Sequence, residues 1–573
     1  MAHWKPLKLN EVIEQISKDE IVLPVIQRNL VWKPEEMALL FDTLFKGDSF
    51  GGIMTIKDLK GRRPIFEYHS FIRQYQTGQI IFSKDEEKLD KNISYIVDGQ
   101  QRLSSFYIGV LGEFDSKKLY FDLFGEASER SFNFKFTQNK SELKSLVDNF
   151  DGTQKNQTFW FQVTLLYNIF QETGHQWRDA LLQIEQDLPL ELTDKQKANL
   201  ERNLECFQNA IFASPNIGIC EVQINSKTDT IENRLNVVEL FRRLNQGGTR
   251  LDAMELMRSK LKAFSADNEI FLHESKTEFQ DICFNQDSII KLLFLLQDDH
   301  NKDLANINKQ DSDFIQNYKE RIRSALKGTR EFLKCAGLFE YFNSTKPIVT
   351  PLYFITYHLF HLNKTENEIE NYFKNAETNN PDFLEIKKWL ILSILNNVYR
   401  RGTGWDPNKT GIRKVLEVIK NNKNNTFPTE NIFSVYKSHP LEFESEIKDD
   451  YEWLNWYDRD LLVYLLYGRP SNFRVNDIDH IHPKSILAKQ ENPNWANKIN
   501  SIGNYQYLDF STNRSKQDKE LWDWIENHVE HKQAYLKFHL IPTDKDLWKS
   551  INFEAFLDSR RTLIFERIQK QLE

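Results

Sequence analysis

One stretch near the C-terminal end constrains this chain more than any other: Val475 to Lys516, VNDIDHIHPKSILAKQENPNWANKINSIGNYQYLDFSTNRSK. It places a carboxylate beside an imidazole, at Asp479 and His480, and follows them with two asparagines, Asn504 and Asn513. A hard cation such as Mg2+ takes oxygen ligands from carboxylates and amides and keeps waters for a substrate phosphate. A neutral imidazole can remove a proton from the attacking water. The pattern therefore predicts the site of a metal-dependent phosphodiesterase.

The same stretch predicts two strands and a helix. Val475 to Ile481 alternates loosely between apolar and polar residues, and Pro483 ends this strand because it lacks an N–H group. Ser501 to Leu508 follows a polar turn as a second strand. Ser511 or Thr512 is predicted to cap the helix that follows.

Strand geometry sets a condition on this site. Adjacent strand residues face opposite sides, so Asp479 and His480 share one site only if the backbone twists or bulges there. On the helix, Asn513 and Lys516 are three residues apart and lie on one face. That spacing suits a metal ligand beside a lysine that contacts phosphate.

DIDHIHP followed by IGNYQYLDFSTNRSK resembles the HNH nucleases of the His-Me finger class, whose core is a two-stranded hairpin and a helix around one metal. The resemblance implies His480 as the general base and Asp479 and Asn513 as metal ligands. It implies that Asn504 holds the loop of His480 in shape, and that His482 contacts the scissile phosphate. Many HNH domains also carry paired CxxC zinc knuckles, which this sequence lacks.

Composition indicates a soluble globular protein. With 573 residues, of which 40% are hydrophobic, the chain is long enough for two to four domains. No stretch approaches the roughly 18 uninterrupted apolar residues of a membrane span, and the N-terminus lacks a signal-peptide core. A cytoplasmic protein without membrane contact is expected. The four cysteines are scattered, which argues against disulfides and structural zinc: Cys206, Cys220, Cys283 and Cys335.

The net charge of −8 is unusual for an enzyme that acts on nucleic acid. Even Arg474 to Lys549 is neutral on balance, with eleven Lys or Arg and eleven Asp or Glu. Affinity for phosphates must then come from locally arranged cations, which mildly favours a selective enzyme.

A second motif lies near the N-terminus, in ISYIVDGQQRLSSFYIGVL. Ile93 to Val97 reads as a strand and the residues from Leu103 as a helix, so Asp98 to Arg102 forms the turn between them. Free N–H groups at a helix start make such a turn a natural anion site. Gly99 allows close approach of a phosphate, and the Arg102 guanidinium can bind it bidentately. The alternative is an Asp–Arg pair that only closes the turn.

IVDGQQRL, together with LPVIQRNLVW and LFRRLNQGGTRLDAMEL, resembles the ParB-like NTPase domain of GmrSD-type restriction systems. The resemblance implies hydrolysis of an NTP, with GTP, ATP and UTP left open. A P-loop is excluded because no GxxxxGK[ST] occurs. For Gly247 and Gly248 a plain helix–helix turn is an equal alternative. The implied nucleotide-site residues are Gln27, Arg28, Asp98, Gly99, Gln100, Gln101, Arg102, Asn245, Gly247 and Gly248.

The remaining chain is predicted to be mainly helical. Pro34 begins one helix and Gly47 to Gly52 ends it, and Gly218 to Ile224 reads as a strand that returns to the first domain. The expected class is α+β and predominantly helical. Its parts are a ParB-like α/β domain (1–250), a helical middle (251–450) and a ββα-metal HNH domain (451–573). Further helices are expected at Asn156 to Leu188, Leu192 to Ala213, Tyr451 to Tyr467 and Asn552 to Glu573.

Together the two motif sets resemble the fused GmrS–GmrD arrangement, also seen in SspE-type effectors of phosphorothioate defence. The resemblance implies an antiphage restriction enzyme: a modification-dependent, NTP-regulated DNA endonuclease that uses Mg2+ or Mn2+ and binds modified phage DNA. Homo-oligomerisation stays open. Two alternatives also stay open, a nucleotide-switched DNA-binding protein with a vestigial nuclease, and a nuclease that cleaves RNA in an abortive response.

Overall fold

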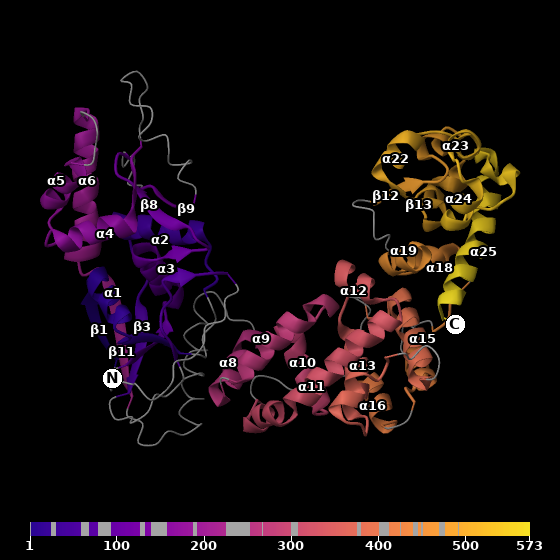
Figure 1. The fold of residues 1–573 in the computed structure, drawn as a ribbon, viewed down its shortest axis with the longest axis horizontal. Helices are drawn as coiled ribbons and strands as arrows, with labels where there is room; N and C mark the ends of the chain where they lie inside the picture. The colour runs from indigo at the N-terminus through magenta and orange to yellow at the C-terminus, as the bar shows by residue number, and fades with distance from the viewer. Residues whose placement is uncertain are drawn as a thin grey trace. The chain divides into compact units, whose positions relative to one another are not determined.

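A computed structural model describes most of the chain, and it separates into two compact units. The first unit is Met1–Ile270 with Asp303–Asp313, and the second is Phe271–Lys302 with Phe314–Glu573. Both are drawn in Figure 1. The described residues are 2–24, 30–58, 68–77, 93–125, 132–138, 158–186, 192–224, 253–265, 267–299, 307–374, 380–399, 412–423, 426–438, 445–448, 451–468, 476–490 and 492–572.

The first unit is built around a mixed six-stranded sheet with the order β1-β11-β3-β6-β2-β4. β1 pairs antiparallel with β11, β11 parallel with β3, and β3 antiparallel with β6. β6 and β2 are parallel, and β4 closes the edge antiparallel to β2. The strands are β1 Ala2–Leu7, β2 Ile21–Pro24, β3 Ile53–Asp58, β4 Tyr68–His69, β6 Ser94–Asp98 and β11 Ile217–Ile224.

Helices cover this sheet and bury its apolar side chains. α2 begins at Pro34, whose fixed φ suits the first helical position, and Gly47 ends it in the left-handed conformation with φ 73°. Phe41 of α2 meets Phe106 of α3 edge to face, with ring centroids 5.3 Å apart. The helices are α1 Leu9–Ser17, α2 Pro34–Lys46, α3 Gln100–Leu111, α4 Val163–Glu172, α5 Trp177–Gln186, α6 Asp194–Gln208 and α8 Ala253–Phe264.

Two smaller sheets in this unit were not predicted from the sequence. β10, β8 and β9 form three antiparallel strands, and β5 pairs with β7. Phe121 and Phe134 stack across β8 and β9 with centroids 4.6 Å apart. β10 also corrects the helix expected from residue 156 onward, because α4 begins only after it. The strands are β5 Gln74–Tyr75, β7 Glu113–Phe114, β8 Lys118–Asp122, β9 Phe134–Thr137 and β10 Trp160–Gln162.

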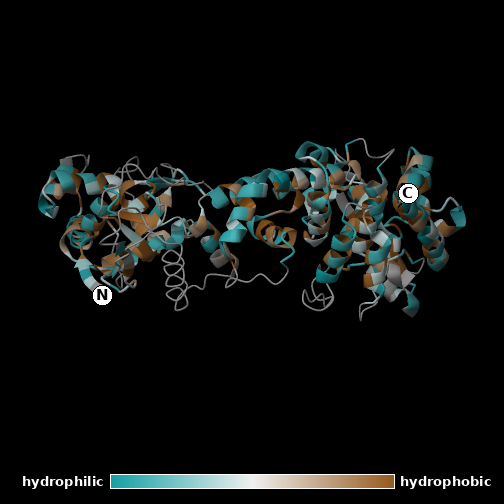
Figure 2. Ribbon diagram, turned by 90° about the horizontal axis from the view of Figure 1, so that it is seen from below, coloured by the Kyte–Doolittle hydropathy of each residue, from teal (hydrophilic) through white to brown (hydrophobic). Residues whose placement is uncertain are grey.

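The second unit begins with helices that pack around apolar surfaces. Their amphipathic character is visible in Figure 2, where hydrophobic and hydrophilic residues alternate along single helices. Trp389 of α15 is fully buried and donates a hydrogen bond to the Tyr436 hydroxyl of α17 at 2.9 Å. The helices are α9 Asp267–Phe279, α10 Gln286–Leu296, α11 Lys309–Cys335, α12 Phe339–Thr345, α13 Thr350–His361, α14 Glu366–Glu370, α15 Pro381–Leu395, α16 Ile412–Asn421 and α17 Thr429–Lys437.

The C-terminal part of this unit holds the strand, strand and helix expected around residue 480. The single helix expected over 451–467 is instead two, because Asp458 caps a new helix through the Leu461 N–H. α25 confirms the predicted final helix. None of the described helices is long and apolar enough to cross a membrane. The elements are α18 Tyr451–Trp456, α19 Arg459–Tyr467, β12 Asn476–His480, α20 Lys484–Ala488, α21 Ala496–Ile499, β13 Tyr505–Asp509, α22 Phe510–Lys516, α23 Leu521–His528, α24 Lys532–His539 and α25 Phe553–Leu572.

Candidate functional site

The candidate nuclease residues lie on the antiparallel pair β12 and β13 and on α22, which directly follows β13. Asp479 is paired with Gln506 and His480 with Tyr505. The pairing runs in register through both residues, so the two side chains leave the pair on opposite faces. Their contacts accordingly do not overlap.

The start of α22 differs from the prediction. Asp509, and not Ser511 or Thr512, is the N-cap, and its carboxylate accepts hydrogen bonds from the backbone N–H groups of both. The hydroxyls of Ser511 and Thr512 also donate to this carboxylate and lower the pKa of Asp509 to about 2. The cap turns the chain from strand to helix within one residue and so places α22 against both strands.

Asp479 is part of a buried ion pair. Its Oδ2 lies 2.8 Å from the Lys516 ammonium and accepts a hydrogen bond of 2.8 Å from the Gln506 amide. The Lys516 side chain is fully buried and also donates to the His480 carbonyl oxygen at 2.7 Å. Burial lowers the pKa of Lys516, and the neighbouring carboxylate opposes this shift. Lys516 thus fixes the Asp479–His480 segment through the Asp479 carboxylate and the His480 carbonyl oxygen. A phosphate contact by Lys516 remains a prediction.

His480 lies half-exposed at the end of β12. Its Nε2 is 3.0 Å from the Asn500 side-chain oxygen, and its ring meets that of Tyr505 edge-on at 5.1 Å. Because an amide oxygen only accepts hydrogen bonds, this contact places the proton on Nε2 and leaves the Nδ1 lone pair available in the neutral ring. The arrangement can therefore accept a proton.

Asn504 is fully buried and fixes the turn that follows β12. Its side-chain oxygen accepts the His482 N–H at 2.9 Å, and its amide donates to the carbonyls of His482 and Ile499 at 3.1 and 3.0 Å. The Asn504 carbonyl also accepts the Ile481 N–H at 2.8 Å. The Asn504 side chain therefore ties the turn that follows β12 to the turn that precedes β13, at the same end of the strand pair.

His482 is completely buried, in contrast to the phosphate contact expected for it. Its ring packs edge-on against Phe553 and Phe556, with centroids 5.7 and 4.5 Å away. Burial, with the nearby Lys516 charge, lowers the pKa of His482 to about 3, although a backbone contact with Leu547 slightly favours the protonated form. The ring is a neutral core residue here, and a phosphate would need a rearranged loop to reach it.

The side-chain oxygens that could bind a metal ion, those of Asp479 and Asn513, suit a hard cation. Asp479 is 9% exposed, and only its Oδ2 has the two contacts described above, which leaves Oδ1 as a ligand. Asn513 is half-buried on α22, the helix that packs against β12. A carboxylate and an amide oxygen suit Mg2+ or Mn2+. Within the described ranges, no three His, Cys, Asp or Glu side chains gather into a metal site, so these two would need substrate and water oxygens.

Arg560 is a site residue that the sequence analysis missed. Its fully buried guanidinium, on α25, donates to the carbonyls of Gly503 and Tyr505 at 2.6 and 2.7 Å and to the Tyr467 hydroxyl at 2.8 Å. It thereby holds the start of β13. The available signal was its spacing, because Arg560 shares the apolar face of the helix with Phe556 and Ile564.

The DGQQR motif of the first unit lies at the turn from β6 to α3, as predicted. Gly99 caps α3 in the left-handed conformation with φ 91°, and no side chain caps the first N–H groups. β3 has an irregular register opposite Asp98, at Met54 and Thr55. The turn therefore offers backbone donors beside a distorted strand.

The side chains of this turn are bonded within the protein. Arg102 is 3.1 Å from Asp98 Oδ2 and donates to the Phe50 carbonyl at 2.8 Å. The Gln101 side-chain oxygen accepts the Val31 N–H at 2.8 Å. The pair that closes the turn is thus formed, as the alternative reading expected. Of the implied nucleotide residues, five lie outside the described part of the chain: Gln27, Arg28, Asn245, Gly247 and Gly248.

Comparison with known families connects this unit with restriction enzymes. Residues 9–262 match the family model described as GmrSD restriction endonuclease, N-terminal domain. The match includes the DGQQR turn and all strands of its six-stranded sheet except β1. A search of curated proteins finds no match. The first unit is therefore similar to the N-terminal domain of a restriction endonuclease family.

Proposed function

We propose that the chain is an NTP-regulated, modification-dependent DNA endonuclease, cutting with its C-terminal β12–β13–α22 site. The observation that carries the nuclease assignment is the β12–β13–α22 arrangement, which carries Asp479, His480 and Asn513. Asn504 and Lys516 bond to the backbone at the C-terminal end of β12 and just after it. An HNH nuclease requires this strand, strand and helix around one metal.

The roles follow from the contacts. His480, with its Nε2 held by Asn500, accepts the proton of the attacking water at Nδ1. Asp479 Oδ1 and the Asn513 amide oxygen would hold Mg2+ or Mn2+, which supplies charge stabilisation of the phosphate when bound. Lys516 lies too deep to meet a substrate without movement, so it acts here by orienting the Asp479 carboxylate through their ion pair.

The nucleotide role belongs to the DGQQR turn. The start of α3, where the positive end of the helix dipole lies, would donate backbone hydrogen bonds to a phosphate. The Arg102 guanidinium would leave its ion pair with Asp98, whose side chain is 46% exposed, and bind a phosphate of the nucleotide instead. Which NTP binds and which DNA modification is sensed are left to experiment.

The test is cleavage of unmodified plasmid, DNA with glucosylated hydroxymethylcytosine and phosphorothioate DNA in Mg2+, with and without each NTP. Wild type should cut one modified substrate, and His480→Ala should lose about 10²–10⁴-fold in rate. His528→Ala is the matched control, because this half-exposed histidine on α23 should leave the rate unchanged.

The outcomes separate the alternatives. If the His480-dependent site cleaves RNA but not DNA, the enzyme is an RNA nuclease and the proposed DNA substrate is wrong. Unchanged biological activity of His480→Ala, with NTP hydrolysis that depends on Arg102, would instead indicate a nucleotide-switched binding protein.

A further inference from the structure

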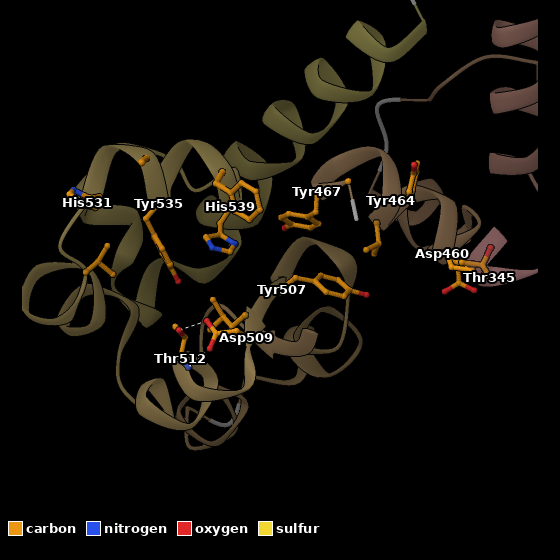
Figure 3. Close-up of a pocket in the computed structure, with 17 residues that line it drawn as sticks. Thr345, Asp460, Tyr464, Tyr467, Tyr507, Asp509, Thr512, His531, Tyr535 and His539 are labelled. Carbon is orange, nitrogen blue, oxygen red and sulfur yellow. Dashed lines mark hydrogen bonds between the residues drawn. The ribbon is translucent and has the colours of Figure 1, made fainter. Parts of the chain in front are cut away.

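A cavity of about 880 Å³ opens beside the candidate nuclease strands in the second unit. Figure 3 shows its labelled side chains converging from four elements: Tyr467 from α19, Tyr507 from β13, Thr512 from α22 and His539 from α24. Its volume lies at the upper end of the roughly 300–1,000 Å³ of small-molecule sites. Neither the nuclease chemistry nor the nucleotide turn uses it.

The lining is aromatic and partly open to solvent. Tyr464, Tyr467, Tyr507, Tyr535 and Phe538 all contribute to it. Phe538 is 43% exposed, which is unusual for a side chain whose burial would stabilise the fold. Flat rings that stay partly uncovered are the common means by which proteins bind unstacked bases.

The charge of the lining excludes a phosphate as occupant. None of the 17 described residues that line the cavity is Lys or Arg, whereas two are carboxylates, Asp460 and Asp509. The Asp509 carboxylate is held by its capping contacts, and Asp460 stands in the first turn of α19. The cavity therefore favours an uncharged ring that donates hydrogen bonds, as an exocyclic amino group does.

The cavity wall is connected to the candidate metal ligand. The Tyr535 hydroxyl donates to the Gln506 side-chain oxygen at 2.8 Å, and the Gln506 amide donates to Asp479 at 2.8 Å. Thr512 in the wall directly precedes Asn513. A group seated in the cavity thus lies behind the same strand pair that carries the cutting residues.

We propose that this cavity receives an unstacked nucleobase of the DNA strand that the nuclease site cuts. The proposal rests on the proposed nuclease function and adds a base-binding pocket to it. An extruded base loses its stacking in the duplex and regains it on Tyr507 and Phe538, with Asp460 as acceptor at the rim.

The experiment measures binding of full-length protein, inactivated by His480→Ala, to a labelled single-stranded DNA oligonucleotide in Mg2+. The same oligonucleotide is prepared with one abasic site at each successive position. If a base enters the cavity, one abasic position should weaken binding about 10-fold, as loss of one stacked base does. Phe538→Ala should weaken binding to the intact oligonucleotide by a similar factor and add at most about 2-fold at that abasic position.

Two further variants guard the interpretation. Trp522→Ala is the matched control, because this aromatic is 45% exposed on α23 and does not line the cavity, and it should bind both oligonucleotides as the parent does. Ala534→Phe fills the cavity from α24 and should reproduce the loss of Phe538→Ala, with thermal melting used to verify that both variants fold.

The results separate the two proposals. If Phe538→Ala weakens all oligonucleotides equally, or none, while His480-dependent DNA cleavage persists in the active protein, the base pocket is wrong and the nuclease stands. If the wild type neither binds nor cuts DNA, both proposals fail.

Discussion

Asp98 with Arg102 in the first unit and Asp479 with Lys516 in the second are the same kind of acid–base pair in different surroundings. The charged atoms are 3.1 Å apart in the first pair and 2.8 Å in the second. The side-chain exposures are 46% and 15% for Asp98 and Arg102, against 10% and 0% for Asp479 and Lys516. A half-exposed pair can exchange partners with a ligand at little cost, whereas a buried pair is bound into the fold.

The largest expected effect is from breaking the buried pair. Lys516→Met should lower the free energy of unfolding of the second unit by about 3–5 kcal/mol, because it leaves the Asp479 carboxylate without its cation. Calorimetry of the full chain, with hydrogen exchange of the β13 amides, measures this loss. Lys519→Met is the control, because this neighbouring half-exposed lysine donates to the Ser515 carbonyl. A loss below about 1 kcal/mol for Lys516→Met would remove the contrast.

The next largest effect is expected at Asn504, whose buried side-chain amide holds the turn that follows β12. Asn504→Ala should lower the free energy of unfolding by about 3 kcal/mol, because the His482 backbone and the Ile499 carbonyl lose the hydrogen bonds of the Asn504 side chain. Gln101→Ala is its counterpart at the DGQQR turn and should cost about 1 kcal/mol, since the Val31 N–H that it releases is exposed to water. Urea unfolding of both variants tests the comparison, and equal losses would contradict it.

A smaller effect concerns pH. The pKa of His482 is about 3 in the folded chain, against an ordinary value near 6.5 in the unfolded one, so only the unfolded state takes up a proton between these values. The stability that this residue contributes is therefore complete above pH 6.5 and is lost as the pH falls toward 3. From pH 7 to pH 5 the loss is about 2 kcal/mol.

His482→Leu should flatten the pH dependence of the melting temperature of the second unit by the corresponding amount. His531→Leu, at the half-exposed start of α24, is the control and should keep the parental slope. An unchanged slope in His482→Leu would show that the buried ring does not resist protonation.

The smallest structural effect is expected at the half-exposed pair. Arg102→Ala should change the free energy of unfolding by about 1 kcal/mol or less, because water replaces much of what Asp98 loses. If the DGQQR turn binds NTP, the same variant should abolish NTP hydrolysis. If the same calorimetry found that Arg102→Ala loses as much free energy of unfolding as Lys516→Met, the role of Arg102 would be to stabilise the fold.

Local patterns predicted much of the C-terminal site. Alternation and Pro483 located the first strand, and the register of β12 confirmed it within one residue at each end. The pattern could not predict how deeply each side chain is buried. The three-residue spacing put Asn513 and Lys516 on one face of the helix, but it did not reveal that Lys516 is buried under Asp479. That depends on residues far along the chain.

Long-range pairing explains the other misses. β8, β9 and β10 are short and separated, so their stacked phenylalanines meet only in the folded chain. Arg560 was missed because its carbonyl partners, Gly503 and Tyr505, lie more than fifty residues earlier in the chain. The helix break before α19 was missed because apolar residues lie on both sides of Asp458, as they would in a single helix.

The position of Arg560 has a consequence for synthesis of the chain. The ribosome adds it 80 residues after His480 (560 minus 480), which takes about 4–16 s at ordinary elongation rates of about 5–20 residues per second. Until then the carbonyls of Gly503 and Tyr505 lack the guanidinium that holds β13 in place. A nascent chain or a prematurely stopped product would therefore carry the candidate residues Asp479 and His480 without the contacts that Arg560 makes to β13.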